Sequence, residues 1–72
     1  MNDILEQLKN YTILCVEDED GIRKRLVNTL KYYFKEVYEA SNADVGYELY
    51  YEYKPSVIIS DIENLPKNVS TL

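Results

Sequence analysis

The chain has 72 residues, 46% of them apolar and 29% charged, and carries a formal net charge of -5 with no histidine. A chain of this length forms one small domain at most and buries only about 60% of the surface that it exposes when unfolded. The acidic balance argues against direct binding to nucleic acid, and the missing histidine removes the commonest general base and metal ligand. We therefore expect a small, acidic, globular protein.

The compartment is suggested by the single cysteine and by the first residues of the chain. Cys15 cannot form an internal disulfide, and it lies inside an apolar run, where a small buried side chain is expected. Residues 1–6 lack the basic start and apolar core of a secretory signal, and no apolar run approaches the roughly 20 residues of a membrane helix. We predict a cytoplasmic protein without a membrane segment.

The first half of the chain reads as a helix, a strand and a second helix. Residues 2–10 show a short amphipathic pattern, typical of a lead-in helix. Residues 11–16 form a continuous apolar run that predicts a strand buried on both faces and ends at an acidic run. Asp20 is the expected N-cap of the next helix. The apolar residues of that helix recur near helical spacing, at Ile22, Leu26, Leu30, Tyr33 and Phe34.

The second half continues the alternation. Residues 36–40 alternate in the manner of a short strand, and Ser41 or Asn42 can cap a helix that runs to about residue 53. Gly46 weakens this helix by about 1 kcal/mol relative to alanine unless a close contact with the sheet requires it. The inner stripe of the helix would be Ala43, Gly46, Tyr47, Tyr50 and Tyr53, and Lys54 and Pro55 would end it.

A third strand follows at residues 57–60, an apolar run that Asp61 terminates. The order is therefore β-α-β-α-β, which predicts an α/β fold with a parallel sheet covered by helices. Right-handed connections then place the two helices on opposite faces and give a flavodoxin-like, doubly wound sheet with strand order 2-1-3. Residues 1–10 would precede this domain as a lead-in helix.

Acidic residues follow the first and third strands, at the switch point of this topology. Glu17, Asp18, Asp61 and Glu63 would converge there, because sites in open α/β sheets form outside the carboxyl ends of the strands. Carboxylates brought close together repel one another, and a hard divalent cation such as magnesium relieves that repulsion. Without histidine, zinc is disfavoured and a serine-histidine pair is excluded.

The same residues allow a purely structural interpretation. Acidic side chains at strand ends and helix starts are common as solvated loops and caps, and this reading of Glu17, Asp18 and Asp61 stays open on the pattern alone. Glu19 is expected to be simply exposed. The tyrosines are better explained as core residues or as solvent-facing edges, although Tyr51 would point outward and could contribute to a partner surface.

Three segments of the chain resemble the receiver domain of bacterial response regulators: residues 13–19 with the acidic pair, residues 39–42, and residues 53–63. The resemblance implies that Asp61 accepts a phosphoryl group from a sensor histidine kinase. It also implies a Mg²⁺ ion bound by the carboxylates of Glu17, Asp18 and Asp61 and by the main-chain carbonyl of Glu63. Phosphoryl transfer depends mostly on positioning and charge neutralisation, which agrees with such a site.

The resemblance covers residues 11–63 and fails in the tail, residues 64–72, where the family's glycine-containing turn is missing. The family's fourth and fifth strands, its phosphorylation-sensing hydroxyl residue and its phosphate-contacting lysine are also missing, and Lys67 matches no family position. Residues 11–72 would thus be an incomplete receiver domain, defective in signalling. Its third strand would be a bare edge that favours self-association.

Two other functions stay open. A metal-independent interaction module would use the tyrosine-rich helix that ends near residue 53, or the sheet edge, to bind a partner. A metal-dependent nuclease is the less favoured alternative, because Glu17 and the acidic pair Asp61 and Glu63 broadly resemble the metal site of toprim enzymes, whereas the chain has no basic patch for nucleic acid.

Overall fold

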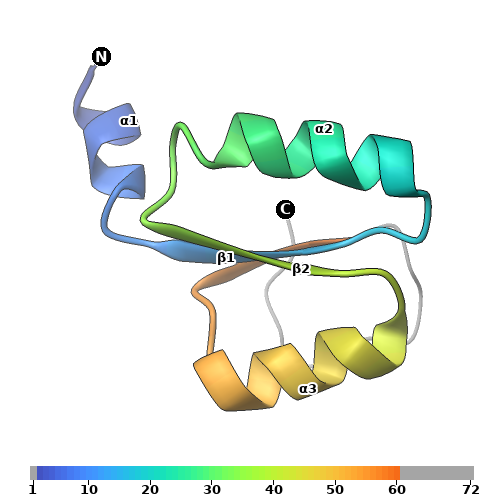
Figure 1. Ribbon diagram of the computed structural model, residues 1–72. Coiled ribbons are helices and arrows are strands. Elements are labelled where there is room, and N and C mark those ends of the chain that lie inside the picture. Colours follow the sequence, from blue (N-terminus) through green and yellow to red (C-terminus); the bar gives the residue numbers. More distant parts are fainter. Residues whose placement is uncertain (1, 61–72) are drawn as a thin grey trace.

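The structure, a computed structural model, describes residues 2–60, with side chains from residue 4 onward. Within this range three parallel strands form one sheet, and helices lie on both of its faces (Figure 1). The elements in chain order are α1 (Asn2–Leu8), β1 (Thr12–Val16), α2 (Asp20–Leu30), β2 (Glu36–Ala40), α3 (Ala43–Tyr53) and β3 (Val57–Ser60). The predicted order of strands and helices is confirmed.

The sheet has the strand order β2-β1-β3, with β1 in the centre and both neighbours parallel to it. Figure 1 shows α2 above the sheet and α3 below it, as right-handed connections require. The fold is therefore of the flavodoxin-like α/β type, as predicted. Val16, the last residue of β1, pairs with Ala40 of β2 and with Ser60 of β3, so all three strands end at the same edge. We call this edge the carboxyl edge.

The face of the sheet under α3 holds the larger apolar core. Four buried side chains from the three strands form a cluster there, and side chains of β2 and α3 pack against it. The buried members are Leu14, Val16, Ala40 and Ile58, and the packing members are Tyr38, Val45, Leu49 and Tyr50. Alternate residues of a strand point to opposite faces, so β-branched and aliphatic residues in a continuous run fill both sides of β1.

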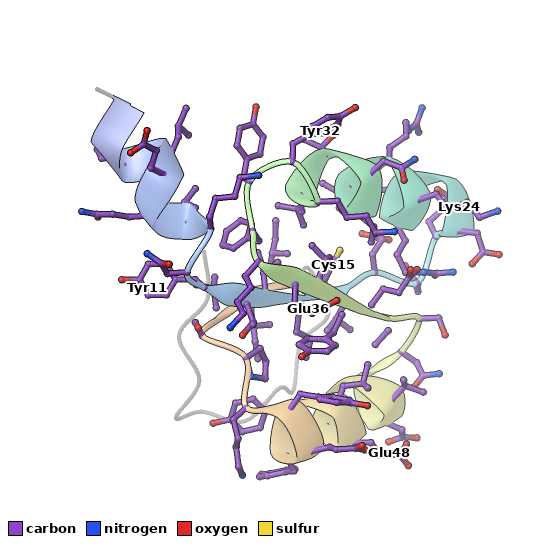
Figure 2. All side chains as sticks on the ribbon, turned by 60° about the vertical axis from the view of Figure 1, so that its left-hand side comes forward. Tyr11, Cys15, Lys24, Tyr32, Glu36 and Glu48 are labelled. Atoms are coloured by element: carbon purple, nitrogen blue, oxygen red, sulfur yellow. The ribbon has the colours of Figure 1, made fainter. Side chains whose placement is uncertain are left out.

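The opposite face, under α2, has a second set of buried side chains. Ile13 and Cys15 point to this side of β1, and the sulfur of Cys15 is directed toward α2 in Figure 2. Val27 of α2 and Phe34, which follows the helix, are also buried. The expected burial of Cys15 is confirmed, with 1% of its surface exposed.

Helix α2 differs from the prediction at both ends. Its N-cap is Glu19 rather than Asp20, because the Glu19 carboxylate accepts a hydrogen bond from the backbone N–H of Ile22. Asp20 is instead the first helical residue. The helix ends at Leu30, and the backbone N–H of Tyr33 bonds the carbonyl of Leu30 in a tighter turn, so the predicted apolar stripe continues beyond the helix itself.

Helix α3 begins and ends where the sequence predicts. Asn42 is the N-cap, and its side-chain oxygen accepts from the backbone N–H of Val45. Gly46 is buried within α3, a helix that contacts both β1 and β2, and whether a close contact with the sheet requires a glycine at this position stays a prediction. Lys54 ends the helix in the left-handed conformation with φ of 50°, and Pro55 follows.

One residue of the predicted inner stripe of α3 lies elsewhere. Tyr53 is 47% exposed, and its ring stacks on that of Tyr38, with 4.5 Å between the ring centroids. The pKa of Tyr53 is raised, chiefly by a hydrogen bond with the carboxylate of Glu52, which is easier to keep while the phenol is protonated. Val45 and Leu49, absent from the predicted stripe, take part in the core instead.

Helix α1 is present within the predicted range 2–10, and it projects from one end of the sheet in Figure 1. Its apolar side chains Ile4 and Leu5 are 70% and 49% exposed. The division of the chain into a lead-in helix and a domain at residue 10 stays a prediction. Among the helices of residues 2–60, none combines the length and the apolar character that a membrane crossing requires. Within the same range β3 pairs only with β1, and self-association through its outer edge also stays a prediction.

Candidate functional site

The turn from β1 to α2 places Glu17 and Asp18 at the carboxyl edge of the central strand. Glu17 immediately follows β1, and its backbone N–H donates to the carbonyl of Ala40 at 3.0 Å, which extends the pairing of β1 with β2 by one residue. Only 6% of Glu17 is exposed, and it is the one buried charged residue in the part of the chain that the structure describes. A buried carboxylate is costly unless polar groups surround it, so this position calls for partners.

The main chain of the turn supplies one of these partners. The Glu17 Oε2 atom accepts from the backbone N–H of Glu19 at 2.9 Å. The Glu19 Oε2 atom in turn accepts from the N–H of Ile22 at 2.7 Å. Two successive glutamates therefore bind backbone N–H groups of the turn and of the first turn of α2, where the helix dipole also favours negative charge. The turn is held in one conformation by its own side chains.

Asp18 lies between these two glutamates and is exposed. Within residues 2–60 its carboxylate has no hydrogen-bond partner, in contrast to the carboxylates on either side. A short turn that fixes its neighbours and presents one carboxylate to solvent leaves that carboxylate available to an external ligand. The two predicted ligands on this turn thus have different surroundings: Glu17 is buried and Asp18 is open.

Arg23 connects this turn to two other elements. Its Nη1 atom donates to the backbone carbonyl of Glu17 at 2.9 Å, its Nη2 atom to Asp20 Oδ1 at 2.6 Å, and its Nε atom to Glu39 Oε1 at 3.3 Å. The pKa of Arg23 is raised, first by the hydrogen bond to Asp20 and further by Glu39, against the opposing effect of desolvation. The guanidinium is therefore charged at any pH at which the chain is folded.

The third strand ends beside this turn. Ser60 is the last residue of β3 and pairs with Val16, the residue before Glu17. Asp61 follows Ser60 in the sequence, but Asp61 and Glu63 lie outside the described residues. The structure therefore places Glu17 and Asp18 at the predicted edge and leaves the convergence of all four residues a prediction. Within residues 2–60, no three side chains of histidine, cysteine, aspartate or glutamate are grouped as a metal site would require.

The donor set on the turn fits a hard divalent cation. Glu17 and Asp18 offer carboxylate oxygens only, which suit Mg²⁺ or Ca²⁺ and not the softer metals that select nitrogen and sulfur ligands. Mg²⁺ is commonly held by one or two carboxylates with water in its remaining positions, and a turn with two acids has donors of that kind and number. The fit thus rests on ligand chemistry and on the neighbouring positions of the two residues in one turn.

Arg23 is the residue of this site that the sequence pattern did not single out. Its spacing from Asp20, three residues along a helix, is a recognisable signal for an ion pair on a helix surface. Its contacts with Glu39 and with the Glu17 carbonyl depend on how α2 packs beside β1 and β2, and spacing along the sequence cannot reveal them.

Comparison with known proteins gives two matches and no family model. The chain is 34% identical over 71 residues to the protein named histidine kinase P4 of Formosa agariphila. The alignment includes 99% of the chain but only 5% of that protein, so the chain corresponds to a small part of its relative.

The second match is a crystal structure of the N-terminal domain of an uncharacterized protein from Wolinella succinogenes. The TM-score is 0.70 with 37% sequence identity, and the alignment covers 79% of the chain and 45% of the solved one. This match supports the flavodoxin-like fold. The chain spans less than half the length of the domain to which it is structurally similar.

Proposed function

We propose that the chain carries the acidic site of a receiver module in a two-component phosphorelay, with Asp61 as the phosphoacceptor and a sensor histidine kinase as the phosphodonor. The observation that carries the proposal is the pair formed by buried Glu17 and exposed Asp18 at the carboxyl end of the central strand. The strand order and the similarity to a segment of a protein named as a histidine kinase support it.

The proposed reaction needs little from the protein beyond position and charge. A carboxylate oxygen of Asp61 attacks the phosphorus atom of a phosphohistidine, the P–N bond breaks, and the imidazole retains the bonding electron pair and takes up a proton. The product is an acyl phosphate on Asp61. A Mg²⁺ ion held by Glu17, Asp18, Asp61 and the Glu63 carbonyl would neutralise the negative charge of the phosphoryl oxygens. In this role the chain is a phosphoacceptor and not an enzyme with a separate substrate.

The test is a covalent mass increase. The chain is incubated with a small-molecule phosphodonor and millimolar Mg²⁺, and the intact mass is measured for the wild type and for Asp61→Asn. We expect one added phosphoryl group on the wild type and none on the variant. Asp44→Asn, which makes the same chemical change in the exposed first turn of α3, is the matched control and should be modified like the wild type. Modification of both wild type and Asp61→Asn, or of neither, would contradict the proposal.

A metal-independent interaction module is the second candidate, and a surface groove favours it. The groove lies between α1 and the turn after α2, and is lined by Leu5, Glu6, Lys9, Tyr32 and Tyr33. Tyr32 is 76% exposed, and the neighbouring apolar residues of α1 are exposed as well. This function predicts that the amide spectrum of the chain does not respond to Mg²⁺, whereas the receiver function predicts a response at the β1–α2 turn.

A further inference from the structure

Arg23 makes hydrogen bonds to α2, to β2 and to the end of β1. It is the fourth residue of α2, only 13% of its side chain is exposed, and its three donor atoms reach three separate elements. These are Asp20 within α2, Glu39 on β2, and the backbone carbonyl of Glu17 at the end of β1. A planar guanidinium with several fixed donors suits such a junction better than any other side chain.

Arg23 contacts Glu17 through the main-chain carbonyl and not through the carboxylate, so it can fix the main chain of the turn. The N–H of Glu17 is bonded to the carbonyl of Ala40, and its carbonyl is bonded to Arg23. Both polar groups of this residue's main chain are therefore held. The carboxylate that extends from it accepts from the N–H of Glu19. Movement of the Glu17 carbonyl would displace the carboxylate and the turn that carries Asp18.

We propose that Arg23 is a positioning residue for the acidic pair: by holding the Glu17 carbonyl against α2 and β2, it fixes the turn in the conformation that binds a divalent cation. The metal-binding part of this inference rests on the proposed function. The ordering of the turn by Arg23 does not, and it can be measured without any metal.

Removal of Arg23 should change the affinity for Mg²⁺ in opposite directions, depending on whether its charge or its hydrogen bonds matter more. A guanidinium close to two carboxylates repels a cation, so on charge alone its removal should strengthen Mg²⁺ binding. If Arg23 positions the turn, its removal should weaken Mg²⁺ binding, because the ligands are then less ordered before binding and ordering them costs free energy. The sign of the change in affinity therefore separates the two effects.

The first experiment is a Mg²⁺ titration followed by the amide shifts of the β1–α2 turn, on the wild type, Arg23→Gln and Arg25→Gln. Arg25 lies on the same helix and is exposed, so Arg25→Gln removes the same charge without touching the turn. We expect Arg23→Gln to weaken binding by about tenfold, as losses of supporting hydrogen bonds at metal sites commonly do. Arg25→Gln should leave affinity within about twofold of the wild type, because distant exposed charges are screened.

Arg23→Lys separates geometry from charge. It keeps the positive charge but replaces the fork of donors by one ammonium group, which cannot reach all three partners at once. Affinity should fall between that of the wild type and that of Arg23→Gln. If Arg23→Lys binds Mg²⁺ like the wild type, a fixed fork of donors is not needed and the inference is wrong in that respect.

The second experiment needs no metal. Hydrogen exchange of the Glu19 amide, whose N–H bonds the Glu17 carboxylate, is compared in the same variants without Mg²⁺. Exchange should be faster in Arg23→Gln and unchanged in Arg25→Gln, while the amide of Leu14 in the core stays protected in both. Should Arg23→Gln fail to fold, Glu39→Ala removes the acceptor for Arg23 Nε on β2 and should show the same change in smaller degree.

The outcomes distinguish the inference from the function on which it partly rests. If the wild type does not bind Mg²⁺, the metal site of the proposed function is wrong, and Glu19 exchange alone decides the role of Arg23. If the wild type binds but Arg23→Gln matches Arg25→Gln in affinity and in exchange, the proposed function stands and the inference is overturned. Tighter binding by Arg23→Gln would also overturn it.

Discussion

Helices α2 and α3 have the same length and the same type of N-terminal cap, yet they contribute differently to the molecule. Each has 11 residues and begins at the carboxyl edge with a side-chain cap that accepts from the third residue of the helix. At the fourth position α2 carries Arg23, which makes three polar contacts, and α3 carries buried Gly46. The seventh position is leucine in both, at Leu26 and Leu49.

The difference shows how one architecture supplies both stability and a site. Gly46 has no side chain to separate α3 from the sheet, and the apolar side chains around it pack on the larger core. Arg23 instead directs the start of α2 toward polar groups at the end of β1. We infer that α3 mainly stabilises the fold, whereas the first turn of α2 mainly determines the conformation of the acidic turn.

The largest change in stability is expected at the seventh position of the two helices, which is leucine in both. Leu49 packs against the buried cluster beneath α3, so Leu49→Ala should lower the free energy of unfolding by about 2–3 kcal/mol. Leu26 is also partly buried but belongs to the sparser face, and Leu26→Ala should cost about 1 kcal/mol. Urea denaturation of the two variants measures both values. Equal losses, or a larger loss at Leu26, would break the comparison.

A smaller effect is expected at the caps. Asn42→Ala removes the side-chain acceptor for the Val45 N–H and should cost about 1 kcal/mol. Glu19→Asn gives α2 the cap residue of α3 and removes one of several neighbouring negative charges, so it should raise stability by a few tenths of a kcal/mol. Both changes are measured as shifts of the urea midpoint. A loss of stability in Glu19→Asn would show that the longer glutamate side chain is required by the turn.

The fold was predictable because the hydrophobic pattern and the topology rules act together. The apolar runs ending at Val16 and Ser60 identified β1, which is buried on both faces, and β3, which is buried in part, and the handedness of the connections then gave the strand order. Asn42 was predicted as one of two possible caps, and this was confirmed because capping is a local property. Features that depend on local chemistry can therefore be predicted from a single sequence.

The details that depend on packing were not predictable. Asp20 is the better cap by propensity, but Glu19 accepts from the Ile22 N–H at the capping position and the Asp20 carboxylate bonds Arg23 instead. Tyr53 was expected in the inner stripe of α3 and is instead 47% exposed, with its ring stacked on that of Tyr38 in β2. The role of Arg23 depends on Glu39, which is 16 residues away, and so required the structure. Glu17 and Asp18 lie at the end of β1 as predicted, because strand ends follow from the strands, and their role as metal ligands stays a prediction.

The most direct test of the central claim is the backbone amide spectrum of the chain with and without millimolar Mg²⁺. If the β1–α2 turn is a cation site, Mg²⁺ should shift the amides of Glu17, Asp18 and residues 61–63, and leave unchanged those at the start of α3, where the first turn carries the single acidic residue Asp44. A spectrum that does not change, or shifts of equal size at Asp44 and at Asp18, would contradict the claim and leave the acidic turn as a helix-capping element alone.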